Sequence, residues 1–177
     1  VYWTDGYGRV SYTTNSIISP VVKIALKEFA GDMKAVTGFD AKEKSGAPIQ
    51  IYQLDQLTNK EFSAVEKLGA PLHLIITAKD AFYIGTRKGK LIVIGSNARG
   101  TAYAIMKLSE LAGVSPLAAW NDLQPAQRKS LYTPVDQQWI EVPRIEFRGL
   151  ALNNSQWMKP QNYSRIARLM LRLRANT

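Results

Sequence analysis

A run of four consecutive apolar residues, Leu91 to Ile94, constrains the fold of this chain more than any other feature. A strand with one exposed face alternates apolar and polar residues, whereas the strand expected over 90–95 is apolar on both faces. It is therefore predicted to lie in the centre of a sheet. The turn Arg87-Lys88-Gly89 joins it, as a hairpin, to a strand expected over 81–86.

Two helices have clear start and stop signals. Ser19-Pro20 predicts a helix start, with a capping side chain followed by proline at the first helical position, and Gly38 ends that helix. Ser96 or Asn97 caps a second helix that runs to about Ala112. The other elements expected in this part of the chain are a helix over 58–68 and strands over 10–18, 49–54 and 72–77.

The sequence pattern divides the chain into three parts. Residues 1–115 are predicted to form an accessory α+β domain, a mixed β-sheet with helices packed on it. Residues 116–143, with a proline about every nine residues, are predicted to be a linker that carries one or two short strands. Residues 144–177 hold a strand over 145–153 and a helix over 162–174. Because a lone strand and helix cannot bury both of their faces, this part is interpreted as the first β-strand and α-helix of a truncated (β/α)8 barrel.

The residue types exclude several kinds of active site. The chain has no cysteine, which excludes disulfides, thiolate metal sites and cysteine nucleophiles, and it has one histidine, His73. His73 alternates with leucine and isoleucine, so it is predicted to be a sheet residue. The loop from Gly95 to Thr101 lacks the Lys-Ser/Thr pair of a phosphate-binding loop. No catalytic residue, cofactor site or metal ligand is therefore assigned, and no apolar run is long enough to span a membrane.

The charge of the chain leaves alternatives open. The formal net charge is +9, and Arg165, Arg168 and Arg172 share one face of the last predicted helix. These arginines are expected to be solvated, or to meet acids on a sequence beyond this chain. Nucleic-acid binding is disfavoured because no recognition-helix or RNA-binding pattern accompanies them. The four tryptophans, Trp3, Trp120, Trp139 and Trp157, either fill interdomain contacts or form a sugar-stacking platform.

Several short motifs carry a family resemblance. They are Arg99-Gly100-Thr101-Ala102-Tyr103-Ala104-Ile105, Leu108-Ser109-Glu110, Ala112-Gly113-Val114-Ser115-Pro116 and Trp120. This part of the chain resembles the first domain of glycoside hydrolase family 115, the xylan α-glucuronidases, and more distantly the N-terminal domains of families 67 and 20. The stretch from Ile145 to Leu150 and the ending from Leu169 to Thr177 resemble the first strand and helix of the catalytic (β/α)8 barrel of that family.

The resemblance implies a non-catalytic N-terminal domain of a periplasmic or secreted enzyme that acts on xylan or a related plant polysaccharide. Its partners would be the missing catalytic barrel of the same chain and, through the parent enzyme, carbohydrate. Asn153, Asn154 and Trp157 are the candidate sugar-contacting residues, because they follow the first barrel strand. Asn153 matches the family pattern, whereas Asn154 and Ser155 stand where carboxylates are expected. The alternatives are an independent carbohydrate-binding module and a basic polyanion- or nucleic-acid-binding domain.

Overall fold

A computed structural model describes residues 1–120, 123–151 and 159–177. Six strands form one mixed sheet in the order β2-β1-β3-β5-β4-β6. Neighbouring strands from β2 to β5 in this order are parallel, and β4 is antiparallel to both β5 and β6. The strands are β1 (Ser11–Thr14), β2 (Lys42–Glu43), β3 (Ile49–Gln53), β4 (Phe82–Arg87), β5 (Lys90–Gly95) and β6 (Gln138–Glu141). The mixed α+β sheet expected from the sequence is confirmed.

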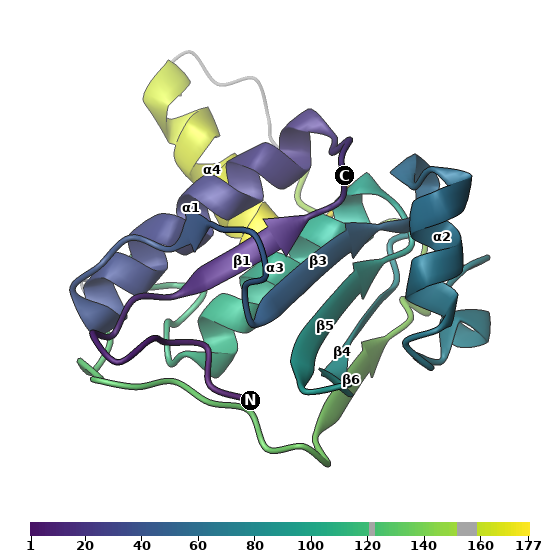
Figure 1. Cartoon of the computed structure of the whole chain (residues 1–177). Coiled ribbons are helices and arrows are strands. Elements are labelled where there is room, and N and C mark those ends of the chain that lie inside the picture. The colour runs from purple at the N-terminus through teal and green to yellow at the C-terminus, as the bar shows by residue number, and fades with distance from the viewer. Residues whose placement is uncertain (121–122, 152–158) are drawn as a thin grey trace.

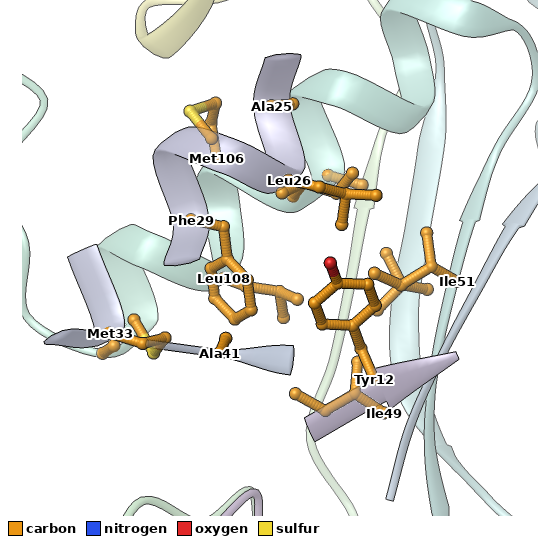
Figure 2. Close-up of a cluster of buried hydrophobic side chains, with 14 of the residues drawn as sticks. Tyr12, Ala25, Leu26, Phe29, Met33, Ala41, Ile49, Ile51, Met106 and Leu108 are labelled. Atoms are coloured by element: carbon orange, nitrogen blue, oxygen red, sulfur yellow. The ribbon is translucent and has the colours of Figure 1, made fainter. Parts of the chain in front are cut away.

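Helices cover both faces of this sheet (Figure 1). The helices α1 (Pro20–Thr37) and α3 (Ala98–Leu111) pack together on one face, and α2 (Asn59–Glu66) covers the other. Two short 3-10 turns, η1 (Leu54–Gln56) and η2 (Leu72–Leu74), flank α2. The last helix, α4 (Pro160–Arg172), lies against the layer of α1 and α3. Figure 2 shows the main core, in which the ring of Phe29 of α1 lies edge-on to that of Tyr12 of β1 and Leu108 of α3 belongs to the same cluster.

The β5 strand occupies the central position that its apolar run predicts. Leu91 and Val93 point into the core beneath α1 and α3, whereas Ile92 and Ile94 point into the core beneath α2. All four side chains are fully buried. The run is therefore apolar on both faces because both faces are covered.

The strand expected over 72–77 is wrong. Residues 72–74 form η2, in which the N–H of Leu74 bonds to Pro71 O and that of Ile75 to Leu72 O. Only Ile75 is buried in this stretch, and His73 is exposed. Residues 72–77 do not join the sheet as a strand beside β4, because β6 already pairs with that edge of β4.

The segment expected as a linker contributes to the sheet. Its strand β6 pairs with β4, and the N–H of Trp3 bonds to Leu131 O at 2.8 Å. The strand expected over 145–153 does not form in its described residues, 145–151. A strand needs hydrogen-bonding neighbours along its length, and here the backbone N–H groups of Asn176 and Thr177 reach only Arg148 O.

A capping box starts α2 and gives a local test of stability. Thr58 Oγ1 accepts a hydrogen bond from Glu61 N, and Glu61 Oε2 accepts one from Thr58 N at 2.9 Å. Hydrogen bonds from Ser16 N and Thr58 N lower the pKa of Glu61 to about 2. Replacing Thr58 by alanine is expected to lower the free energy of unfolding by about 1 kcal/mol, measured by urea denaturation. Ser63→Ala, an exposed change within the same helix, is the control and should stay within about 0.5 kcal/mol of the original chain.

Candidate functional site at the carboxyl edge of the sheet

The carboxyl ends of β1, β3 and β5 meet at one edge of the sheet, where the C-terminal segment of the chain also lies. Ligand and interdomain contacts in α/β sheets gather at such an edge. Here Asn97 caps α3, and Asp80 precedes β4 in a left-handed conformation with φ of 61°. Aspartate is among the few residues that adopt this conformation readily.

The Asp80 carboxylate connects this edge to the C-terminal segment. Its Oδ1 accepts hydrogen bonds from Asn97 Nδ2 and Arg99 Nε, both at 3.0 Å. Its Oδ2 accepts from Asn176 Nδ2 at 3.1 Å and faces Arg148 Nη2 at 3.5 Å. Asp80 is 1% exposed. Burial alone would raise the pKa of Asp80, but these donors outweigh it and hold the pKa below its ordinary value. We call these five residues the Asp80 junction.

Backbone contacts bring the two ends of the C-terminal segment together at this junction. Arg148 O accepts from the N–H of Asn176 at 2.6 Å, and Arg148 N donates to Asn176 Oδ1 at 2.9 Å. Tyr103 of α3 donates its hydroxyl hydrogen to Ala175 O at 2.8 Å. Residues 145–151 and 175–177 therefore lie side by side, with α4 between them in the sequence.

The helix α4 docks on the domain through its arginines. Arg172 forms a bidentate pair with Asp32 of α1, at 2.8 and 2.9 Å, and also reaches Glu28 at 3.3 Å. Arg168 Nε lies 3.4 Å from Glu28 Oε1. The guanidinium of Arg165 stacks over the ring of Trp120, 4.9 Å from its centre.

These contacts correct both expectations for the arginine face. Two of its members, Arg168 and Arg172, are neither merely solvated nor reserved for acids elsewhere, because they pair with acids on α1 of this same chain. The carboxylates beside Arg172 outweigh its burial and raise its pKa, so its charge persists. Two of the three positive charges on this helix face are thus paired with acids of the same chain.

The C-terminal segment also exposes apolar side chains. Ile145 is 67% exposed, Phe147 69%, Leu150 59% and Leu173 52%. In α4, Ile166, Leu169 and Met170 are only partly buried. We call the first four residues the apolar tail surface. The segment thus docks through its arginines and through Leu171, which packs against the main core, and leaves these other apolar side chains exposed.

The residues proposed to contact sugar, Asn153, Asn154 and Trp157, lie outside the described residues. Of the other tryptophans, Trp3 is buried and donates Nε1–H to Thr133 Oγ1 at 2.8 Å, and Trp139 packs against the core. Trp120 is exposed but stacks on Arg165. These three do not form a common stacking platform, which removes the main support for an independent carbohydrate-binding module.

The junction itself was not anticipated from the sequence. Its members are separated by up to 96 positions, and an aspartate in a loop gives no signal of such partners. Among the described residues, no group of three or more His, Asp or Glu side chains is placed to hold a metal ion. No helix described here is long and apolar enough to cross a membrane.

Three solved structures locate the fold among known proteins. A search of protein-family models and a search of curated proteins each found no match. BtGH115A, a family GH115 4-O-methyl-α-glucuronidase with specificity for decorated arabinogalactans, is 27% identical with a TM-score of 0.80; the match covers 97% of this chain and 25% of that one. The chitobiase FjGH20 of Flavobacterium johnsoniae is 17% identical with a TM-score of 0.61, over 99% of this chain and 24% of that one.

The third structure is a GH138 enzyme that targets pectin rhamnogalacturonan II. It is 12% identical with a TM-score of 0.58, over 94% of this chain and 18% of that one. The chain thus spans about a quarter or less of the length of each of these enzymes. Its fold is that of a domain found in carbohydrate-active enzymes, and its resemblance to the N-terminal domains of family 115 and family 20 glycoside hydrolases, expected from the sequence, is confirmed.

Proposed function

We propose that this chain is the N-terminal, non-catalytic domain of an α-glucuronidase-like glycoside hydrolase, and that it packs against the catalytic barrel and shapes the rim of its cleft. The observation that carries the proposal is the likeness to BtGH115A, which extends over 97% of this chain at a TM-score of 0.80. The family 20 and family 138 likenesses support the fold alone.

The arrangement of the C-terminal segment supports a barrel start. In a (β/α)8 barrel each strand is followed by a helix and then by a parallel neighbouring strand. Residues 145–151, α4 and residues 175–177 follow this order, with the two outer pieces joined by the bonds between Arg148 and Asn176. Further strands beside them would complete the pairing that residues 145–151 lack.

The apolar tail surface supports the binding of a partner that has an apolar surface of its own. Large apolar side chains that are exposed together in one segment of a globular domain favour an interaction site. The partner we assign to it is the catalytic barrel, expected to be encoded in the roughly 250 residues that make one barrel. The domain division at residues 115 and 143 belongs to this proposal, as do sugar contacts by Asn153, Asn154 and Trp157.

The substrate and location of the parent enzyme are further parts of the proposal. Glucuronate-decorated xylan is the substrate class that the family resemblance favours, and the decorated arabinogalactans of BtGH115A are the nearest alternative. A polymer of this size is degraded outside the cytoplasm, which favours a periplasmic or secreted enzyme.

Association with the separately produced barrel segment tests this function. The 177-residue chain is expected to bind that segment and to release no glucuronic acid from glucuronoxylan or arabinogalactan by itself, whereas the joined protein releases it from one of them. Phe147→Asp should abolish association and leave the melting temperature of the chain unchanged, because Phe147 is exposed in the chain alone. Val135→Asp, an equally exposed apolar position near the opposite edge of the sheet, is the matched control.

Two results would contradict the proposal. One is turnover by the 177-residue chain alone. The other is association between the chain and the barrel segment that Phe147→Asp leaves unchanged.

A further inference from the structure

A second surface of the domain combines a hollow, exposed aromatic rings and cations without ion-pair partners. It lies at the amino edge of the sheet, where α1 ends and β1 begins, on the side away from the Asp80 junction (Figure 1). The hollow measures about 740 Å³, within the range of small-ligand sites. A neighbouring hollow of about 590 Å³ shares Gly38 and Phe39 with it, so the two form one groove that passes Phe39.

Arg9 lines the larger of these two hollows. Its guanidinium lies 5.1 Å from the ring centre of Phe39 and 5.6 Å from that of Tyr7. Both rings are exposed, Tyr7 by 77% and Phe39 by 40%. The stacking holds the guanidinium in place without an anionic partner, so its N–H donors stay available to a ligand.

The charges around Arg9 favour a carboxylate at one end of the groove. Lys42 and Lys44 line the same hollow, and within residues 1–120, 123–151 and 159–177 neither these lysines nor Arg9 forms an ion pair. The Asp5 carboxylate lies near Arg9 and Lys44 without forming an ion pair, and its Oδ1 accepts hydrogen bonds from the backbone N–H groups of Tyr7 and Arg9, both at 2.9 Å. Because α1 ends beside Phe39, with the negative end of its dipole, an anion in this hollow needs the cations Arg9 and Lys44 next to it.

The other residues that line the hollow favour a sugar over a nucleic acid as its ligand. Asp40 and Glu43 also line the hollow, and their carboxylates accept hydrogen bonds from hydroxyl groups but repel a chain of phosphates. Exposed aromatic rings offer a flat face for a pyranose ring. We infer that this groove binds a carboxylate-bearing saccharide, with the carboxylate beside Arg9 and Lys44 and a sugar ring against Tyr7 and Phe39.

This saccharide site is separate from the proposed contact with the barrel. It would hold an acidic polysaccharide on the face of the domain remote from the apolar tail surface, as an anchor outside any catalytic cleft. Its test therefore needs no barrel and can fail while the proposed function stands.

Calorimetric titration of the 177-residue chain with a tetrasaccharide that carries one uronate residue tests the site, with the neutral tetrasaccharide of the same sugars and a DNA oligonucleotide as comparison ligands. We expect saturable binding of the uronate, at least tenfold weaker in Arg9→Gln and in Tyr7→Ala, and at least tenfold weaker for the neutral sugar. Lys60→Gln removes a similar exposed charge from α2, outside the groove, and should leave affinity unchanged. All three positions are exposed, so unchanged melting temperatures will show that the variants fold.

Three outcomes would overturn the inference. These are no binding of the uronate, uronate binding that Arg9→Gln and Tyr7→Ala leave unchanged, and DNA binding that is tighter than uronate binding and lost in Arg9→Gln. The last would assign the groove to a polyanion instead of a saccharide.

Discussion

Replacing Gly100 by alanine is expected to destabilise the domain by about 2–3 kcal/mol, although alanine is the better helix former. Gly100 lies in the first turn of α3, and an added Cβ would overlap the carbonyl oxygen of Ala81. Ala81 cannot move away easily, because Ser96 N bonds to Ala81 O at 2.9 Å and Ala81 N bonds to Ser96 Oγ at 3.0 Å. The overlap must therefore displace α3 from the sheet.

Gly31→Ala is the matched control for this change. Gly31 lies within α1, and an added Cβ there meets nothing within 4 Å. We expect this variant to gain about 0.5–1 kcal/mol through reduced backbone freedom of the unfolded chain. Urea denaturation of both variants measures the difference, and a Gly100→Ala chain as stable as the original would show that α3 does not approach β4 this closely.

Replacing Asp80 by alanine is expected to lower the free energy of unfolding by about 2–3 kcal/mol and to release the C-terminal segment. Loss of one partner of a buried ion pair costs about 3–5 kcal/mol. We expect the smaller loss of about 2–3 kcal/mol because the side chains of Arg99 and Arg148, 41% and 22% exposed, can turn toward water when Asp80 is removed. Limited proteolysis should cut residues 142–151 faster in Asp80→Ala, while Asp136→Ala, an exposed acid outside the junction, should change neither quantity.

The Asp80 carboxylate also makes part of the stability depend on pH. Its pKa in the folded chain lies below the ordinary value of 3.8, so the carboxylate contributes fully above pH 3.8 and loses its contribution as the pH falls through the lower, folded value. The chain is therefore expected to lose stability below pH 3.8. Asp80→Asn, which keeps the left-handed conformation accessible, should make this loss of stability less steep, although Glu61, with a pKa of about 2, still contributes to it; an unchanged slope would contradict the contribution of Asp80.

Local signals were enough to predict most of the sheet and the two long helices. Pro20 and Gly38 mark the ends of α1, because one cannot sit inside a helix and the other adopts φ of 86°. The apolar run in β5 required cover on both faces, and the structure supplies it. These features depend on neighbouring residues alone, so a sequence reveals them.

The parts that could not be predicted depend on distant residues. Leu72 to Thr77 alternates like a strand, yet β6, much later in the chain, takes the edge of β4. The sequence alone predicts that Arg172 is a surface residue. Its contact with Asp32, 140 positions earlier, depends on where α4 packs in the fold. Asp80 gathers partners from three separate stretches of the chain for the same reason.

The docking of α4 through its arginines has a consequence for the order in which a larger protein would assemble. Ion pairs with Glu28 and Asp32 fix the rotation of this helix about its own axis before any other body touches it. Domains emerge from the ribosome in sequence order and generally fold as units. The proposed catalytic barrel, made afterwards, would meet residues 145–151 and α4 already held in one orientation, and its first strand pairing could start there.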